Sequence, residues 1–360
     1  MPLEAIMLVG GKGTRLRPLT LSAPKPLLPT AGVPFLAHQL TRAAECGISH
    51  VVLATSYQSE MFTEAFGDGS QFGLSVDYVY EPVALGTAGG IRNAASRLHG
   101  GQDDPIVVLN GDILSAHDVA AQVALHTEKD AAATLHLVKV DDPSRYGCVE
   151  TDISGRILKF LEKTANPPTN LINAGCYVFR RSVIDQIPAD RVVSVEKETF
   201  PELIDSGQLM LAYPEFAYWL DVGTPQAFVQ GSCDVVLGRM PSPALPRDRC
   251  GESLVLGGAS VASDASVSGG TCVGAGARVG SGAAVHNSVL FDQSSVGDGA
   301  SVSDSIIGRG AVIGEGAVVT GAVIGDGVIV GPGNELAGGI RIWPGTRLDA
   351  TSIRFSSDAS

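Results

Sequence analysis

A glycine-rich segment with four cations follows the first apolar run of the chain, and its residue types suit the binding of phosphate groups. The segment from Leu8 to Pro26 is LVGGKGTRLRPLTLSAPKP. We expect Gly10, Gly11 and Gly13 to adopt positive φ and to let main-chain N–H groups face oxygen anions. The cations are Lys12, Arg15, Arg17 and Lys25, with no acidic residue among them. Because such close like charges repel one another, the pattern favours an anion-binding segment over a solvated turn.

Two aspartates that each follow a short apolar run are candidates for holding a divalent cation. Asp112 ends the sequence VLNGD, and Asp221 lies in YWLDVGTP. Transfer of a group between phosphates needs charge neutralisation more than covalent catalysis, and carboxylates supply it by binding Mg²⁺. The alternative is that each aspartate caps a helix, a common role at the junction of a strand and a helix.

Two further stretches offer polar groups for a sugar. FLEK contains Glu162 and Lys163, and NAG begins at Asn173. Glu162 can accept hydrogen bonds from two sugar hydroxyls, and Lys163 can reach a sugar phosphate. On its own, a Glu–Lys neighbour pair is more typical of a solvated edge.

A second glycine-rich loop, EPVALGTAGG, runs from Glu81 to Gly90 and follows an apolar run. Its Gly86 and Thr87 could approach a nucleotide, with helix capping by Thr87 as the alternative.

The first glycine-rich segment lacks the spacing of the Walker loop and of the dinucleotide-binding fingerprint. It resembles instead the signature GGxGTRLxPLT, followed by PKP, of the sugar-1-phosphate nucleotidylyltransferases; the match is unbroken from Gly10 to Thr20 and resumes at Pro24. The resemblance implies in-line transfer of a nucleotidyl group from a nucleoside triphosphate to a sugar 1-phosphate, with release of pyrophosphate.

The resemblance also implies a role for each candidate residue. Arg15 is expected to neutralise the departing pyrophosphate, and Lys25 and Lys163 to hold the reacting phosphates. Asp112 and Asp221 are expected to bind Mg²⁺. The positions implied for the nucleotide are Gly10, Gly11, Gly13, Thr14, Glu81, Gly86 and Thr87, and those for the sugar phosphate are Gly147, Glu162, Lys163 and Asn173.

Glu81 aligns roughly where thymidylyl and uridylyl relatives carry glutamine. A carboxylate can accept both adjacent donors of guanine, N1–H and the N2 amine, whereas uracil and thymine present one donor between two carbonyls. Because an unpaired buried charge is costly, we hypothesise that Glu81 selects guanine. The alternative is that Glu81 faces solvent at the end of a strand.

Within the family, the motifs are most similar to those of enzymes that form GDP-mannose, which implies GTP and mannose 1-phosphate as substrates. Transfer to glucose 1-phosphate from UTP, dTTP or ATP, and guanylyl transfer to a heptose phosphate, stay open. A non-enzymatic regulatory relative is a further alternative, but such a chain is expected to lack Arg15, Lys25 or a metal-binding aspartate.

The elements that must position these residues follow from alternating short apolar runs and helical stretches. We predict strands at Ala5–Val9, Val51–Thr55, Val76–Tyr80 and Ile106–Leu109, and helices at Pro34–Cys46, Ala88–Leu98 and Val119–Thr127. This alternation predicts an α/β fold with a Rossmann-like, doubly wound, mostly parallel sheet. Ligands of such sheets bind beyond the carboxyl ends of the strands, where the Gly10 loop lies.

The carboxy-terminal part has a different pattern. Aliphatic residues recur every six residues from Val255 to Leu348, with steps of five at Leu290, Ile307 and Ile324, which are 17 residues apart. Two sixes and a five per coil predict a left-handed parallel β-helix of hexapeptide repeats. We therefore predict a catalytic domain at 1–237, a linker at 238–252, the β-helix at 253–353 and a tail at 354–360.

An acetyltransferase site in the β-helix would need a catalytic histidine, and His286 is more typical of a surface residue.

Composition restricts the partners of the 360-residue chain. A net charge of −13 argues against a nucleic-acid partner. The sequence shows neither a membrane-spanning run nor a signal peptide, so we expect a cytoplasmic protein with no membrane partner. The six cysteines form no CxxC pair and predict neither a zinc site nor a disulfide framework. We also expect a homo-oligomer.

Overall fold

The computed structural model describes residues 2–56, 58–245 and 247–354, which form two compact units. The first unit comprises Met1–Gly11 and Gln39–Trp219, and the second comprises Lys12–His38 and Leu220–Ser360. The segment 12–38 is thus grouped with the β-helix region. The predicted domain limits stay a prediction, and residues 355–360 of the predicted tail lie outside the described residues.

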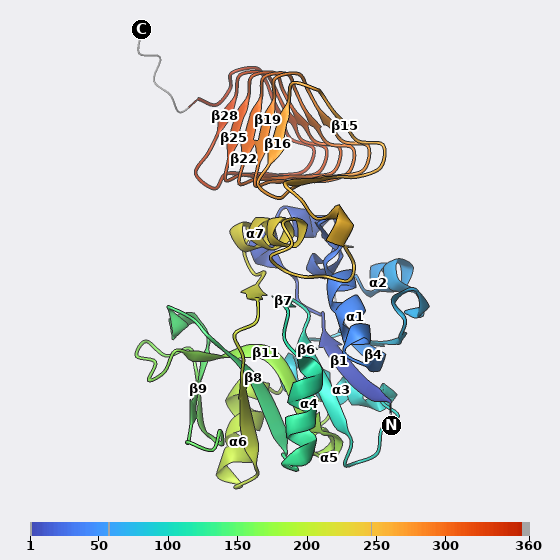
Figure 1. Cartoon of the computed structure of the whole chain (residues 1–360), viewed down its shortest axis with the longest axis vertical. Helices are drawn as coiled ribbons and strands as arrows, with labels where there is room; N and C mark the ends of the chain where they lie inside the picture. The colour runs from blue at the N-terminus through green and yellow to red at the C-terminus, as the bar shows by residue number, and fades with distance from the viewer. Residues whose placement is uncertain (1, 57, 246, 355–360) are drawn as a thin grey trace. The chain divides into compact units, whose positions relative to one another are not determined.

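Four parallel strands form one half of the first unit's sheet, in the order β5–β4–β1–β6 (Figure 1). They are β1 (Leu3–Leu8), β4 (Ile48–Thr55), β5 (Ser75–Tyr80) and β6 (Pro105–Asn110). Each matches a predicted strand, because a parallel strand buried on both faces is a nearly continuous apolar run. The predicted helices are also confirmed as α1 (Phe35–Glu45), α3 (Gly86–Ala94) and α4 (Val119–Glu128), with α3 packed on β1 and β4.

The other half of the sheet continues from β6 through antiparallel β11 (Leu171–Arg180). That strand also pairs with β8 (Ala133–Lys139) and, at one residue, with β9 (Gly147–Thr151). The sheet has nine strands in all. The last two are β10 (Ile157–Glu162), antiparallel to β9, and β12 (Met210–Pro214), parallel to β8. The Rossmann-like fold class is confirmed, and the antiparallel strands extend it.

Shorter elements up to Asp221 connect these strands. They include α2 (Ser59–Phe66), α5 (Arg181–Gln186), α6 (Phe200–Asp205), β7 (Ile113–Ser115), β13 (Trp219–Asp221), the 3₁₀ turns η4 (Ser70–Phe72), η5 (Ala95–Arg97) and η6 (Pro143–Arg145), and a π-helical turn, η7 (Val195–Thr199). In the core, Phe200 contacts Tyr177 and Phe179 at ring-centroid distances of 5.3 and 6.1 Å.

The second unit joins the segment 12–38 to α7 (Pro225–Val236) and to the β-helix. The segment contains η1 (Thr14–Leu16), η2 (Leu19–Leu21), η3 (Lys25–Leu27), β2 (Pro29–Thr30) and β3 (Val33–Pro34), and η8 (Arg247–Arg249) follows α7. The Ala31 N–H donates to Ser232 Oγ of α7 at 2.9 Å, and the Arg341 guanidinium donates to the Arg17 carbonyl at 2.9 Å. The second unit is therefore held together by contacts between residues far apart in sequence.

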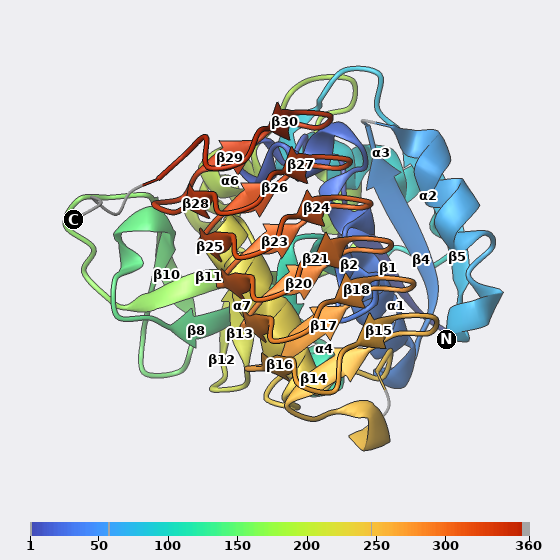
Figure 2. The same ribbon diagram turned by 90° about the horizontal axis from the view of Figure 1, so that it is seen from above.

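The hexapeptide repeat builds three parallel sheets, as its period predicts and as Figure 2 shows from above. The first sheet contains β14 (Ser253–Val255), β17 (Thr271–Val273), β20 (Val289–Leu290), β23 (Ile306–Ile307), β26 (Val323–Ile324) and β29 (Arg341–Ile342). The second contains β15 (Ser260–Val261), β18 (Arg278–Val279), β21 (Ser295–Val296), β24 (Val312–Ile313), β27 (Ile329–Val330) and β30 (Arg347–Leu348). The third contains β16 (Ser266–Ser268), β19 (Ala284–His286), β22 (Ser301–Ser303), β25 (Val318–Thr320) and β28 (Glu335–Leu336).

The repeated aliphatic residues line the inside of the β-helix, as expected for the predicted left-handed coil. Ile307, Ile313 and Val319 have no exposed surface. Val255 in the first coil is 44% exposed, while its register partner Val273 is fully buried. The first coil differs because no preceding coil covers it.

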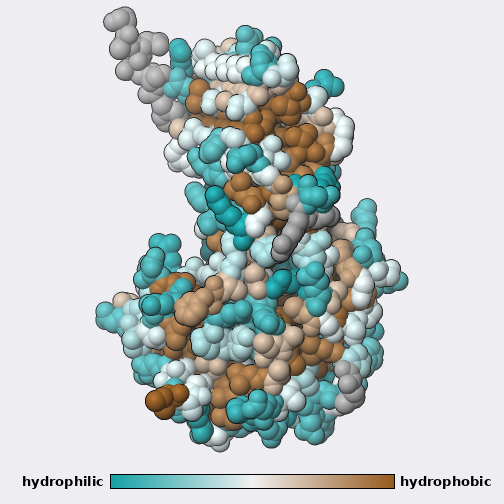
Figure 3. Space-filling view, in the orientation of Figure 1, coloured by the Kyte–Doolittle hydropathy of each residue, from teal (hydrophilic) through white to brown (hydrophobic). Residues whose placement is uncertain are grey.

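The surface of the described residues carries exposed apolar side chains on the β-helix (Figure 3), among them Val312, Val318 and Trp343. The predicted homo-oligomer stays a prediction.

In the part of the chain that the structure describes, no helix combines the length and the apolar character that crossing a membrane requires. No disulfide joins the six cysteines, all of which lie among the described residues, and His286 is exposed, which agrees with its interpretation as a surface residue.

Candidate functional site

The signature segment begins at the carboxyl end of β1, where the main chain is hydrogen-bonded to β4 and to the turn after β6. The Val9 N–H donates to the Ala54 carbonyl at 3.0 Å, and the Gly111 N–H donates to the Leu8 carbonyl at 2.9 Å. A β-carbon on Gly111 would lie 2.5 Å from Val9 Cγ1, so only glycine fits there. This close approach places Asp112, the next residue, beside the start of the signature segment.

The glycines of the signature differ from one another in conformation. Gly13 has a positive φ of 57°, as expected, but Gly10 and Gly11 do not, so that part of the prediction is wrong. Position 10 requires glycine because a larger residue would collide with Ser56. A β-carbon there would lie 2.9 Å from Ser56 Oγ, and the Ser56 hydroxyl donates to the Gly10 carbonyl. Gly11 is exposed, and a β-carbon on it would meet nothing within 4 Å.

Asp112 is half-buried in the turn between β6 and β7 and does not cap a helix. The cap of α4 is Asp118, whose Oδ1 accepts from the Ala121 N–H at 3.0 Å. Gln39 of α1 braces the Asp112 turn, donating from Nε2 to the Asn110 carbonyl at 3.0 Å and to the Ile113 carbonyl at 2.7 Å.

The bracing by α1 was not predicted. Arg42, three residues after Gln39, donates from Nη2 to the His117 carbonyl at 3.0 Å, so both side chains come from one helix face. The sequence signal that could have revealed this bracing is the spacing of Gln39 and Arg42, two long polar side chains three residues apart in the helix FLAHQLTRAAE.

Strand pairing brings the predicted sugar-binding residues of β9 and β10 together. Glu162 is the register partner of Gly147, and a β-carbon on Gly147 would lie 3.1 Å from Glu162 Oε2 and 2.5 Å from Phe160 Cζ. The Lys163 ammonium lies 3.1 Å from Glu162 Oε1 and is mostly exposed. Gly147 thus leaves room for the Glu162 carboxylate.

Asn173 lies where the β8–β11 register shifts. Its Oδ1 accepts from the Gly175 N–H at 3.1 Å, and its Nδ2 donates to the Tyr177 hydroxyl at 2.8 Å. Gly175 has a φ of 76°, and a β-carbon there would lie 2.8 Å from Asn110 Nδ2. The irregularity therefore lies against the carboxyl end of β6, close in sequence to Asp112.

Glu81 is turned into its loop, with an exposed fraction of only 9%. Oε2 accepts from the Leu85 N–H at 3.3 Å, and a β-carbon on Gly90 would lie 2.7 Å from Oε1. Burial raises the pKa of Glu81, and the Leu85 hydrogen bond partly opposes this shift. The alternative that Glu81 faces solvent is therefore wrong.

The two other predicted residues of this loop contact the segment 193–196. Gly86 has a φ of 75°, and a β-carbon there would lie 2.5 Å from the Val193 carbonyl oxygen. The Thr87 hydroxyl donates to Glu196 Oε2 and accepts from the Val195 N–H, both at 2.8 Å. Thr87 does not cap α3, since Leu85 holds that position. Contact of these residues with a nucleotide stays a prediction.

In the second unit, Gly13 begins the turn that carries Thr14 and Arg15. Its carbonyl accepts from the Thr20 hydroxyl at 2.9 Å, and a β-carbon on it would lie 3.1 Å from Lys25 Cβ. Lys25 is buried in η3. The segment therefore folds back on itself between its glycines and its PKP motif.

The structure also brings Arg15 to the motif that contains Asp221. A β-carbon on Gly223 would lie 2.7 Å from Arg15 Nη2, so the guanidinium packs directly on the Gly223 backbone. The cap of α7 is Thr224, whose hydroxyl accepts from the Ala227 N–H at 3.2 Å. The capping alternative is therefore wrong for Asp221 as well. Asp112 and Asp221 present carboxylate oxygens, which is the donor chemistry that Mg²⁺ prefers.

Comparisons with known proteins identify the family of the chain. Residues 4–236 match the family model described as Nucleotidyl transferase, and residues 250–355 match the GMPPB C-terminal domain. The chain is 53% identical to mannose-1-phosphate guanylyltransferase of Mycobacterium tuberculosis over 99% of this chain and 98% of that protein. The chain belongs to the mannose-1-phosphate guanylyltransferase family. It is a nucleotidyltransferase, as the signature predicted.

Two further known proteins are similar to this chain over 64% of its length. The catalytic subunit beta of mannose-1-phosphate guanylyltransferase from Xenopus tropicalis is 39% identical over 64% of both chains. The crystal structure of HddC from Yersinia pseudotuberculosis has a TM-score of 0.55 and 26% identity, and it covers 64% of this chain and 98% of that one.

Proposed function

We propose that this guanylyltransferase family member transfers GMP from GTP to mannose 1-phosphate, forming GDP-mannose and pyrophosphate. The 53% identity to the mycobacterial relative, which extends over nearly the whole chain, carries the proposal. Glu81 supports the choice of base, because each oxygen of its carboxylate can accept a hydrogen bond from one of the adjacent donors of guanine, with Oε2 also accepting from the Leu85 N–H.

The reaction needs no nucleophile from the protein. A phosphate oxygen of mannose 1-phosphate attacks the α-phosphorus of GTP, a new P–O bond forms, and the bond to the departing pyrophosphate breaks in line. Arg15 neutralises the leaving β- and γ-phosphates with its forked guanidinium, and Lys25 and Lys163 hold the reacting phosphates. Asp112 and Asp221 hold Mg²⁺, which would offset the repulsion between the phosphates.

The sugar is held by Glu162 and Asn173. The bonds of Asn173 to Gly175 and Tyr177 use one oxygen lone pair and one amide N–H, so the amide group has a second of each for sugar hydroxyls. Glu162 accepts from further hydroxyls. Hexoses share many of these hydroxyls, so the sugar has to be tested directly.

The decisive measurement is pyrophosphate release by the purified chain with Mg²⁺, each nucleoside triphosphate and either mannose 1-phosphate or glucose 1-phosphate. We expect the highest kcat/KM with GTP and mannose 1-phosphate, and no release after the metal is chelated. A preference for glucose 1-phosphate with UTP, dTTP or ATP would replace the proposal by its enzymatic alternative. No release with any pair would favour a regulatory relative.

Two variants test the assigned roles in the same assay. Arg15→Ala removes charge stabilisation of the leaving group and is expected to lower kcat by about 100-fold or more. Arg17→Ala is the matched control, because residue 17 stands at the variable position of the signature and accepts from Arg341 through its main-chain carbonyl oxygen, which the substitution keeps. Equal losses in both variants would contradict the role of Arg15.

A further inference from the structure

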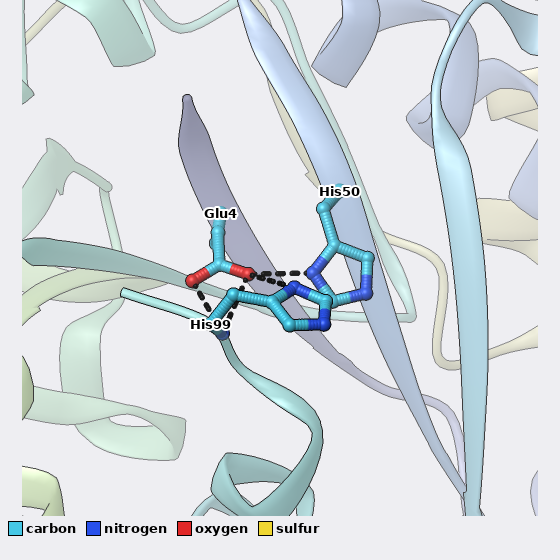
Figure 4. Close-up of side chains that lie close together, drawn as sticks. All are labelled: Glu4, His50 and His99. Carbon is cyan, nitrogen blue, oxygen red and sulfur yellow. Dashed lines mark hydrogen bonds and ion pairs between the residues drawn. The ribbon is translucent and has the colours of Figure 1, made fainter. Parts of the chain in front are cut away.

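Two histidines and a glutamate meet at the amino-terminal end of the parallel strands, away from the proposed reaction (Figure 4). Glu4 belongs to β1, His50 to β4, and His99 to the segment after η5. Glu4 Oε1 lies 2.6 Å from His50 Nδ1 and 3.2 Å from His99 Nδ1. Leu8 lies four residue steps after Glu4 in β1, about 13 Å along a strand, so this cluster is remote from the signature segment.

The Glu4 carboxylate is held in place by main-chain groups. Its Oε2 accepts from the Gly100 N–H at 2.7 Å, the His99 N–H lies 3.0 Å from both carboxylate oxygens, and Oε1 also faces both imidazoles. Burial opposes ionisation, but the hydrogen bonds from His50 and from the backbone outweigh it and lower the pKa of Glu4. The group is therefore an anionic ligand at neutral pH.

Asp77 helps to orient the His50 ring from the side away from Glu4. It is buried, and its Nε2 faces Asp77 Oδ2 of β5 at 3.4 Å. A carboxylate beside the outer nitrogen of a metal-binding histidine fixes its tautomer and raises its basicity. His99 is 75% exposed, so a solvated ion can reach the cluster from that side.

We propose that Glu4, His50 and His99 form a binding site for Zn²⁺ or a similar transition-metal cation. Imidazole nitrogens favour such cations over Mg²⁺, so the site differs from the proposed Asp112 and Asp221 site. Ligands in a tetrahedral zinc site stand about 3.3 Å apart. Glu4 Oε1 and His99 Nδ1 already stand close to that value, and the spacing between Glu4 Oε1 and His50 Nδ1 has to open by less than about 1 Å. Each neutral imidazole binds the ion through Nδ1 and carries its proton on Nε2, which for His50 faces Asp77, and the hydrogen bond from Gly100 to Oε2 is kept.

A second group, formed by His117, His136 and Glu215, is a weaker candidate. His117 Nδ1 lies 2.6 Å from Glu215 Oε2, and its Nε2 lies 2.7 Å from Gln122 Oε1. Both ring nitrogens are therefore engaged, and the His117 and His136 rings are buried and stacked with centroids 3.7 Å apart. His117 and Glu215 therefore form a hydrogen-bonded pair, while both ring nitrogens of His136 are buried without a hydrogen-bond partner among the described residues and its ring is held by stacking.

The test uses the tag-free, full-length chain, dialysed against a chelator and returned to excess Mg²⁺. Co²⁺ is then titrated, its visible absorption reports nitrogen ligation, and Zn²⁺ is added as a competitor. We expect saturable binding of one Co²⁺ at this site, displacement by Zn²⁺, and a higher Tm with Zn²⁺.

Three variants assign the binding to this cluster. His99→Ala changes an exposed residue, so the chain should still fold, and it is expected to weaken Co²⁺ binding at least tenfold. Asp77→Asn is expected to weaken binding through the orientation of His50, and His286→Ala, an exposed histidine of the β-helix, should have no effect. Absence of saturable binding to the folded wild-type chain, or equal affinity of wild type and His99→Ala, would overturn the proposal.

Discussion

At the scale of single residues, the direction of the Glu81 side chain bears on the choice of base. A glutamate at the end of a strand could equally point into solvent, yet here its carboxylate lies within hydrogen-bond distance of the Leu85 N–H and is nearly buried. A buried carboxylate pairs with neighbouring N–H donors and disfavours a carbonyl oxygen.

We predict that Glu81→Gln lowers the preference for GTP over UTP by about tenfold or more. Glutamine would place a donor where one of the guanine donors needs an acceptor. The ratio of kcat/KM values for the two nucleotides measures this effect, with Glu64→Gln on the exposed surface of α2 as the control. An unchanged ratio in the Glu81 variant would sink the hypothesis.

Gly223 is a second residue whose size matters, because the Arg15 guanidinium rests on its backbone. We predict that Gly223→Ala lowers kcat by about 100-fold, since its β-carbon would stand 2.7 Å from Arg15 Nη2 and push the guanidinium aside. The control is Gly257→Ala, where a β-carbon would meet nothing within 4 Å. Steady-state kinetics at saturating substrates, with circular dichroism to confirm folding, would show the difference; similar kcat values for both variants would argue against it.

At the scale of elements, the segment 12–38 is grouped with the β-helix although it directly follows β1. Arg341 of β29 donates to the Arg17 carbonyl, and Leu256 packs against Gly32. The β-helix is therefore a structural support for the segment that carries Arg15.

We predict that Arg341→Ala lowers kcat/KM for GTP by a few fold. Loss of one hydrogen bond to the Arg17 carbonyl, worth about 1 kcal/mol, would loosen the turn next to Arg15. Arg347→Ala in the neighbouring strand β30 is the matched control, because it removes the same charge from the β-helix. Equal kinetics for both variants would mean that the contact does not position the segment.

The elements also differ in how far they could be predicted. Strands β1, β4, β5 and β6 are apolar runs, and the coils of the β-helix repeat a local period, so both could be read from neighbouring residues. The irregularity at Asn173 could not, because it depends on how β11 pairs with β8 and on contact between Gly175 and Asn110.

At the scale of the whole molecule, buried neutral histidines couple stability to pH. Burial lowers the pKa of His38, lowers that of His126 from 6.5 to about 4, and lowers that of His136 to about 2. As the pH falls below about 6.5, the unfolded chain gains protons at these positions while the folded chain stays neutral. The free energy of unfolding therefore decreases with decreasing pH.

We predict that His126 alone accounts for a loss of roughly 2 kcal/mol between pH 7 and pH 5. Denaturant unfolding at several pH values would measure it. His126→Gln should flatten the pH dependence, whereas His286→Gln, at an exposed position, should leave the slope as it is. A slope that does not change in the His126 variant would contradict the assignment.

The reaction class and the β-helix were both determined by the sequence alone, because each depends on residues close together in the chain: the signature from Gly10 to Thr20 and the six-residue aliphatic period. Tertiary structure alone decided the inward direction of Glu81, the packing of Arg15 on Gly223 and the meeting of Glu4 with His50 and His99. These contacts join residues that strand order and loop closure bring together across long stretches of chain. No local spacing records that order, and for this reason the chemistry could be predicted before the geometry that supports it.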